Sequence, residues 1–163
     1  MGIIIRTTSP VFSPADDLRA FENLVGHAGE VTPQGLAGRI AAAESLAFAR
    51  EDQRLVGVGA LKLPATAYTL KVFEKAGVPG DAKSHDLELG WIAVIEEYRG
   101  QGIGASICRK LIAPLGSRPV FSTTRSDNEN MRRILAGIGF SQHGHLFESS
   151  EHPGSLIALL VRG

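Results

Sequence analysis

The chain has 163 residues, 44% of them hydrophobic and 21% charged, which is typical of one globular domain and excludes a disordered or fibrous protein. Lys plus Arg and Asp plus Glu number 17 each. Because nucleic-acid-binding proteins usually carry a basic excess, this balance argues against a nucleic-acid partner.

The cysteine content and the N-terminal residues bear on the compartment. Cys108 is the one cysteine, so an intramolecular disulfide and a cysteine-based zinc cluster are excluded. The short apolar run over residues 3–5 lacks the length and the basic flank of a signal peptide, and no stretch approaches the roughly 18 apolar residues of a membrane span. We therefore expect a cytoplasmic protein with no membrane partner.

The first half of the chain alternates between strand and helix patterns. Residues 3–8 predict a strand. Two helix starts follow, at 13–16 and at 32–33, where a hydroxyl residue precedes a proline. Apolar runs on either side of a polar turn over residues 51–54 predict an antiparallel hairpin.

Residues 64–86 interrupt this pattern as an extra helix and loop. Tyr68, Val72 and Phe73 have helical spacing and predict a short helix, and the Gly- and Pro-containing residues 77–84 predict a polar loop. A connection of more than about 20 residues in a compact domain is usually functional or disordered. We therefore expect the insert to border a functional site.

The second half begins with a strand over residues 87–95 that runs into a glycine-rich segment and a helix. A strand over residues 119–124 precedes another helix, for which Ser126 and Glu129 have the spacing of a capping box. Two late strands are expected to close as a hairpin. The whole order, β, α, α, β, β, insert, β, α, β, α, β, β, predicts a single α/β (α+β) domain over residues 1–163.

The glycine-rich segment Tyr98–Gly104 is the clearest chemical signal. Glycines let the backbone approach a ligand closely, and the first N–H groups of the following helix point at a bound anion. A P-loop would need a glycine followed by Lys-Ser/Thr at the position that Ala105 occupies. A dinucleotide-binding fingerprint would need a glycine at the position that Ile107 occupies. Neither requirement is met, and what remains is Arg-x-x-Gly-x-Gly.

This spelling resembles the GNAT superfamily of acetyl-CoA-dependent N-acetyltransferases. The resemblance includes the preceding strand and turn over Leu89–Tyr98 and the later helix pattern from Asn128 to Phe140. It implies a mixed, mostly antiparallel sheet of roughly six to seven strands, flanked by about four helices, with strands four and five splayed.

The same resemblance implies acetyl-CoA as the co-substrate. The backbone of Ile92, Ala93 and Val94 would pair with the pantetheine arm, and Asn128 matches a family position near the cofactor. The loop amides that would hold the pyrophosphate are those of Arg99, Gly100, Gln101, Gly102, Ile103 and Gly104.

Glu88 is the candidate catalytic base. An alkylamine with a pKa near 10 is only about 0.1% neutral at pH 7, so a base is useful. Glu88 stands six residues before Val94, where the histone acetyltransferase branch of the family carries its glutamate. Strand alternation places it on the face of Ile92 and Val94. The alternative is a solvated carboxylate at the start of a strand.

Other side chains near this strand carry weaker signals. Thr124 and Arg125 are candidates for contact with the substrate, although β propensity and a helix cap also explain them. Many family members have a tyrosine where this chain has Leu135, which fits the apolar face of its helix. His143 and His145 share a strand face without a third ligand, so we expect no metal.

Two functions stay open. The first is an N-acetyltransferase in which a primary amine of an unidentified small molecule or peptide attacks acetyl-CoA directly in a ternary complex. The second is a non-catalytic acyl-CoA sensor or interaction module with the same fold. The absent tyrosine favours the second, whereas the glycines and Glu88 favour the first. A homodimer is left open as the assembly.

Overall fold

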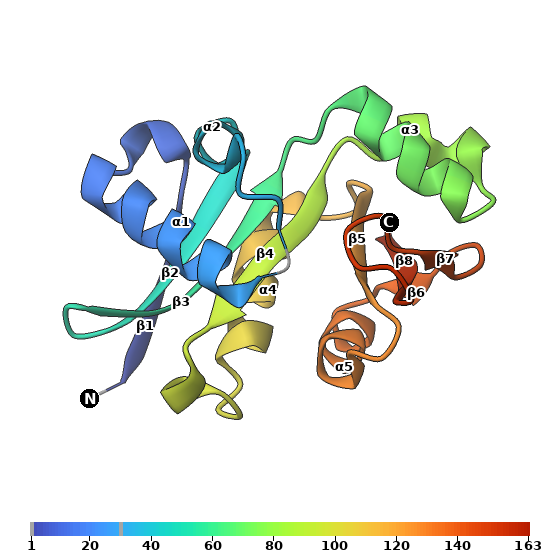
Figure 1. The fold of residues 1–163 in the computed structure, drawn as a ribbon. Helices are drawn as coiled ribbons and strands as arrows, with labels where there is room; N and C mark the ends of the chain where they lie inside the picture. Colours follow the sequence, from blue (N-terminus) through green and yellow to red (C-terminus); the bar gives the residue numbers. More distant parts are fainter. Residues whose placement is uncertain (1, 30) are drawn as a thin grey trace. The chain divides into compact units, whose positions relative to one another are not determined.

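The computed structural model describes residues 2–29 and 31–163, and the chain divides into two compact units. The first unit comprises the residues up to Lys62 together with Leu89–Gly116, and the second comprises Leu63–Glu88 and Ser117–Gly163. The strands join in one sheet with the order β1-β2-β3-β4-β5-β8-β6, and β7 also pairs with β8 (Figure 1). The expectation of a single domain over residues 1–163 stays a prediction.

The first unit holds the N-terminal strands, two helices and the helix that follows the glycine-rich segment. Its strands and α-helices are β1 (Ile3–Thr8), α1 (Ala15–Ala28), α2 (Leu36–Ala41), β2 (Ser45–Glu51), β3 (Arg54–Lys62), all of β4 (Glu88–Val94) except Glu88, and α4 (Ile103–Ile112). Short 3-10 turns are η1 (Pro10–Phe12), η3 (Glu96–Tyr98) and η4 (Ala113–Leu115).

Strands β1, β2 and β3 are antiparallel, so the predicted hairpin is confirmed. Asp52 forms its turn in the left-handed region, with φ 53°, a conformation that Asp tolerates better than most residues. Phe48 of β2 lies opposite Val58 of β3, and both belong to the core that Phe21 of α1 completes. This core fixes α1 and α2 against one face of the strands.

The other face of β3 is made by glycines. Val58 and Ala60 belong to the core on the side of α1, whereas Gly57 and Gly59 alternate with them and lie against α4. A Cβ added to Gly59 would lie 2.5 Å from Ile107 Cγ2. The alternation of glycine and larger residues in β3 thus lets α4 approach the sheet closely.

The second unit holds the insert and the C-terminal part of the chain. Its elements are α3 (Thr66–Lys75), the 3-10 turn η2 (Pro79–Ser84), Glu88 of β4, β5 (Val120–Arg125), α5 (Glu129–Gly137), β6 (Ser141–Gln142), β7 (Phe147–Glu148) and β8 (Leu156–Arg162). Strand β8 is antiparallel to β5, β6 and β7.

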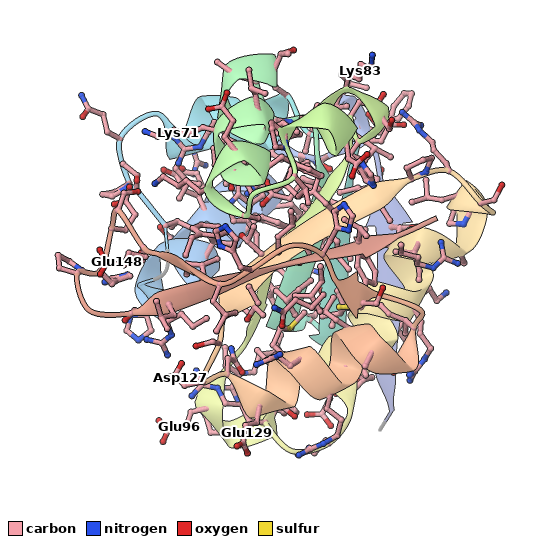
Figure 2. All side chains as sticks on the ribbon, turned by 90° about the vertical axis from the view of Figure 1, so that its right-hand side faces the viewer. Lys71, Lys83, Glu96, Asp127, Glu129 and Glu148 are labelled. Carbon is pink, nitrogen blue, oxygen red and sulfur yellow. The ribbon has the colours of Figure 1, made fainter. Side chains whose placement is uncertain are left out.

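The insert is part of the core of the second unit. Val72 and Phe73 of α3 pack with Phe121 and Leu159, and the Phe73 and Phe121 rings meet edge to face with centroids 5.4 Å apart. Lys71 and Lys83 of the insert are exposed (Figure 2). Deleting the insert would therefore remove core side chains, so point substitutions are the suitable tests of its role.

The predicted fold class is confirmed, with local differences. The sheet is mostly antiparallel, and β4 and β5 are parallel, with Glu88 opposite Phe121. Eight strands are present among the described residues because the late segment forms two strands of two residues each. The polar loop over residues 77–84 forms η2 in part. The expected splay of strands four and five stays a prediction.

The N-cap of α5 differs from the predicted one. The helix begins at Glu129, and Asn128 is its N-cap, with Oδ1 accepting from Met131 N–H at 3.1 Å. The capping box predicted for Ser126 is wrong, because Ser126 and Asp127 form a turn before the helix. Asn at this position satisfies a free helix amide as well as Ser does.

We expect Gly59→Ala to lower the free energy of unfolding by about 1–3 kcal/mol, because the new methyl group meets Ile107 and, at 2.6 Å, Ile92 Cδ1. Gly26→Ala, inside α1, is the control: its added Cβ meets no atom within 4 Å, so no such loss is expected. Urea unfolding of both variants measures the difference, and equal stabilities would contradict the close packing of α4.

Candidate functional site

The glycine-rich segment of the first unit makes an uncapped helix start. Gly100 and Gly102 have φ of 79° and 80°, in the left-handed region that favours glycine. Gly102 is the N-cap of α4, and no side chain caps the helix there. A Cβ added at Gly100 or Gly102 would meet no atom within 4 Å. The first-turn amides, those of Ile103 and Gly104 among them, thus begin a helix beside an open surface.

Side chains anchor this segment within the first unit. Arg99 Nε donates to the Val94 carbonyl at 2.9 Å, which ties the segment to the end of β4. The Tyr98 hydroxyl donates to the Glu51 carboxylate, and Arg54 lies over the Tyr98 ring, 5.5 Å from its centroid. The pKa of the Tyr98 phenol is raised, chiefly by the bond to Glu51. The segment is therefore held by the hairpin of β2 and β3 as well as by β4.

Strand β4 contains an unusual backbone conformation at Trp91. Its φ is 53°, which for a residue other than glycine costs roughly 1–2 kcal/mol. The ring packs against Phe21 with centroids 6.2 Å apart, and Lys62 Nζ lies 4.7 Å from its centroid. These contacts hold Trp91 in place. A residue in the left-handed region interrupts the regular alternation of side chains between the two faces of a strand. Counting positions along β4 therefore does not show that Glu88 and Ile92 lie on the same face.

The backbone of Ile92, Ala93 and Val94 occupies the end of β4, as expected. Ala93 is buried, Ile92 and Val94 are half-buried, and the next amide, that of Ile95, donates to Val56 O at 2.9 Å. Their role in pairing with pantetheine stays a prediction, as does the role of the amides from Arg99 through Gln101 to Gly104.

Glu88 is not a solvated carboxylate. Its residue is 2% exposed. The hydroxyl of Tyr68, on α3 of the same unit, donates to Glu88 Oε2 at 3.1 Å. The Thr123 side chain of β5 lies beside the Tyr68 hydroxyl. The structure thus places a carboxylate, a phenol and an alcohol together in the second unit.

The contact of Tyr68 with Glu88 was not predicted from the sequence. Its spacing with Val72 and Phe73 indicated only a helix face, and twenty positions separate it from Glu88. The length of the insert was the one signal in the sequence that this segment has more than a connecting role.

The other predicted residues of the second unit are placed as follows. Thr124 is buried, whereas Arg125 is half-buried and its Nε lies 3.6 Å from Asp127 Oδ1. Asn128 is exposed and caps α5. Leu135 is fully buried, as its place in the apolar face of the helix predicted. Contact of Thr124 and Arg125 with substrate, and of Asn128 with the cofactor, stays a prediction.

The two late histidines have separate structural partners. His143 Nε2 lies 2.7 Å from Asp81 Oδ2 of the insert. His145 N–H donates to the Ala76 carbonyl at 2.9 Å, and its Nδ1 lies 3.0 Å from Leu146 O. Both histidines therefore help to hold the insert against the end of the sheet in the second unit. Across residues 2–29 and 31–163, no group of three His, Cys, Asp or Glu side chains is arranged to hold a metal ion.

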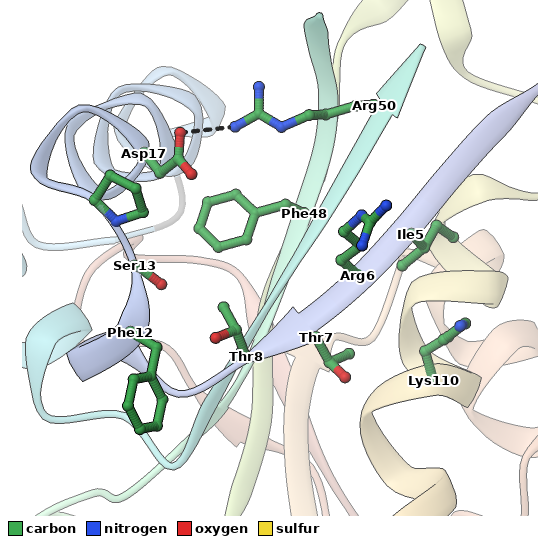
Figure 3. A pocket seen from close by; sticks show the side chains of 11 residues that line it. Ile5, Arg6, Thr7, Thr8, Phe12, Ser13, Asp17, Phe48, Arg50 and Lys110 are labelled. Atoms are coloured by element: carbon green, nitrogen blue, oxygen red, sulfur yellow. Dashed lines mark hydrogen bonds and ion pairs between the residues drawn. The ribbon is translucent and has the colours of Figure 1, made fainter. Parts of the chain in front are cut away.

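A hollow of about 500 Å³ in the first unit is lined by none of the predicted site residues (Figure 3). It follows β1, with Phe12, Phe48 and the ion pair of Arg50 with Asp17 among its walls; this pair has an N–O distance of 2.9 Å. Its size alone does not make it the reaction site, because it is lined by neither the glycine-rich segment nor Glu88.

In the described part of the chain, no helix has the length and apolar character to cross a membrane.

Comparisons with known proteins agree with this geometry. The sequence model of the acetyltransferase (GNAT) family matches residues 14–140. Escherichia coli ElaA is similar in structure, with a TM-score of 0.72 and 15% identity over 99% of this chain and 100% of that chain. An acyl-CoA N-acyltransferase from Pseudomonas aeruginosa has a TM-score of 0.69 and 13% identity over 99% and 100% of the two chains.

A GNAT family acetyltransferase from Elizabethkingia anophelis, solved with acetyl-CoA bound, has a TM-score of 0.62 and 14% identity over 98% of this chain and 97% of that chain. At such identities the likeness of these structures shows the fold. No curated protein matches this chain by sequence.

Cys108 on α4 is fully buried, and burial raises the pKa of its thiol from 9.0 to about 12. At pH 8 its thiolate fraction is about 10³-fold lower than that of the same thiol in the unfolded chain. We expect 5,5′-dithiobis(2-nitrobenzoate) to label Cys108 slowly in the native protein and rapidly in denaturant. Equal labelling rates in both states would contradict its burial.

The raised pKa of Cys108 also predicts how the stability of the protein depends on pH. Between about pH 9 and pH 12 the unfolded thiol ionises and the folded one does not, so this group's contribution to stability is lost as pH rises. Cys108→Ala should remove that part of the alkaline slope in urea unfolding. An unchanged slope would show that the folded thiol titrates normally.

Proposed function

Because this chain belongs to the acetyltransferase (GNAT) family, we propose that it is an N-acetyltransferase that transfers an acetyl group from acetyl-CoA to a primary amine of a small molecule or a peptide. The observation that carries the proposal is the left-handed, uncapped start of α4 at Gly102. A family match over residues 14–140 includes this segment and β4.

The glycine-rich segment fits the pyrophosphate of acetyl-CoA. The pyrophosphate is anionic, and the first amides of α4 supply N–H donors with the positive end of the helix dipole behind them. The open surface above Gly100 and Gly102 leaves room for a ligand to approach the backbone. The acetyl-CoA bound to the Elizabethkingia anophelis relative supports the same class of co-substrate here.

Direct attack of the amine fits the single cysteine better than a covalent route. An acetyl-cysteine intermediate needs a reactive thiolate, and the Cys108 thiol is buried with a raised pKa. The acceptor and acetyl-CoA would therefore be bound together when the amine attacks the thioester carbonyl.

Glu88 is the group we propose as the base. Its carboxylate is buried and held by a hydrogen bond, which is the arrangement expected for a group whose position matters and not for a surface charge. Thr124 and Arg125 follow on β5 of the same unit and are proposed to contact the acceptor.

The alternative is an acyl-CoA sensor or interaction module without chemistry. The fold is compatible with both functions. The buried Glu88 with its tyrosine partner favours the enzyme, because a binding module has no need of a buried carboxylate beside a phenol. Release of free CoA thiol in the presence of an amine panel separates the two.

Acetyl-CoA should stabilise the protein against thermal unfolding by about 2.7 kcal/mol at one hundred times its dissociation constant. Gly102→Asp should abolish this shift, because a carboxylate would meet the pyrophosphate. Gly29→Asp is the matched control: both glycines have nearly the same backbone, with φ, ψ of 80°, 9° and 77°, 7°, and both have open space around Cβ. Equal shifts in the two variants would refute the assignment of the loop.

Glu88→Gln should lower kcat by about 10²- to 10⁴-fold and leave the dissociation constant of acetyl-CoA nearly unchanged. The amide keeps the size of the side chain but accepts no proton. Thiol release with an amine panel, alongside calorimetric titration with acetyl-CoA, measures both quantities. A variant within about twofold of wild type, with the same pH profile, would exclude Glu88 as the base.

A further inference from the structure

The carboxylate of Glu88 and the phenol of Tyr68 differ sharply in exposure. Glu88 is 2% exposed, whereas Tyr68 is 41% exposed. The hydroxyl of Tyr68 lies 3.1 Å from Glu88 Oε2. Tyr68 therefore joins the buried carboxylate to a side chain that is partly exposed, with the hydroxyl end next to Glu88.

We propose that Tyr68, on the insert helix α3, relays protons between the acceptor amine and the buried Glu88. This inference rests on the proposed function, in which Glu88 is the base. It adds a catalytic residue from a segment that carries no family motif. The substrate amine would then meet the Tyr68 oxygen and not the carboxylate itself.

The hydrogen-bonding capacity of the three groups suits such a relay. The tyrosine hydroxyl can both donate and accept a hydrogen bond. Tyr68 donates to Glu88, and the Thr123 side chain lies beside the Tyr68 hydroxyl. While the phenol donates to Glu88, its oxygen can accept from an ammonium N–H. The bond to Glu88 orients the phenol before the amine arrives.

The protonation state of Tyr68 also suits this role. Burial of its hydroxyl end, then the charge of Glu88 and the bond to Glu88, raise the pKa of the Tyr68 phenol well above its usual value. The exposed fraction describes the whole side chain, whereas the hydroxyl itself is turned toward Glu88 and Thr123. The phenol therefore stays protonated and has a proton to pass on.

The step balances as follows. An ammonium N–H of the acceptor gives its proton to Tyr68 Oη while the phenol proton moves to Glu88 Oε2. The neutral amine then attacks the thioester carbonyl, a C–N bond forms and the C–S bond breaks with its electron pair on sulfur. The second amine proton neutralises the CoA thiolate, and the proton on Glu88 leaves to solvent through Tyr68.

Tyr68→Phe tests the relay because it removes the hydroxyl and keeps the ring. We expect kcat to fall by about 10²-fold, with the dissociation constant of acetyl-CoA and the thermal midpoint nearly unchanged. Leu70→Ala is the matched control, since Leu70 is on the same helix and has the same exposed fraction, 41%. Its kcat should stay within about twofold of wild type.

The double variant with Glu88→Gln separates a relay from two independent roles. If both residues act in one relay, Glu88→Gln already removes its contribution to kcat, and Tyr68→Phe adds little further loss. The kcat of the double variant should then be no more than about twofold lower than that of Glu88→Gln alone. If Glu88→Gln is itself silent, the proposed base fails and the relay fails with it. If Glu88→Gln is slow and Tyr68→Phe is silent, or the two effects multiply, the relay alone is overturned.

A spectroscopic test needs no acceptor. The chain has two tyrosines, so in a Tyr98→Phe background the ultraviolet titration of tyrosinate reports Tyr68. We expect ionisation above the usual pH of about 10, and a shift to lower pH when Glu88→Gln removes the negative charge. Ionisation at the ordinary pH in both proteins would show that the hydroxyl does not contact Glu88, and would overturn the proposal.

Discussion

The close approach of α4 to β3 is the constraint on which the glycine-rich segment depends. Gly57 and Gly59 remove the side chains that would separate helix and strand, and Ile107 fills the space. The helix start at Gly102 is then set by the sheet and not by the loop alone. Arg99 and Tyr98 add bonds to β4 and to β2, so the segment is held from both sides. A preorganised set of amides loses little entropy when an anion binds.

In the second unit, folding and chemistry share one element. Helix α3 buries Val72 and Phe73 in the core and presents Tyr68 to Glu88. Because the buried face fixes the rotation of the helix, the position of the phenol follows from the packing of Phe73 against Phe121. Such a residue is held more firmly than one on a mobile loop, which favours a defined hydrogen bond to a buried carboxylate.

Local patterns in the sequence predicted the order of elements and failed where long-range contacts decide. Alternation and helical spacing identified the hairpin over residues 46–61 and the apolar face with Leu135. The contact of Tyr68 with Glu88 has no signature in spacing, because it depends on how the insert packs. The left-handed backbone at Trp91 is equally hidden, since its cost is offset by the packing of its ring, and only an assembled core shows that.

Leu135 and Tyr68 together show why a missing family residue is a weak argument against activity. The helix position where many relatives have tyrosine is occupied by a fully buried leucine that the core requires. A phenol is present nonetheless, on a different element, within hydrogen-bond distance of the carboxylate. Chemistry needs a group at a point in space and not at a place in the chain. The choice between enzyme and sensor therefore turns on the surroundings of Glu88 and not on the motif of α5.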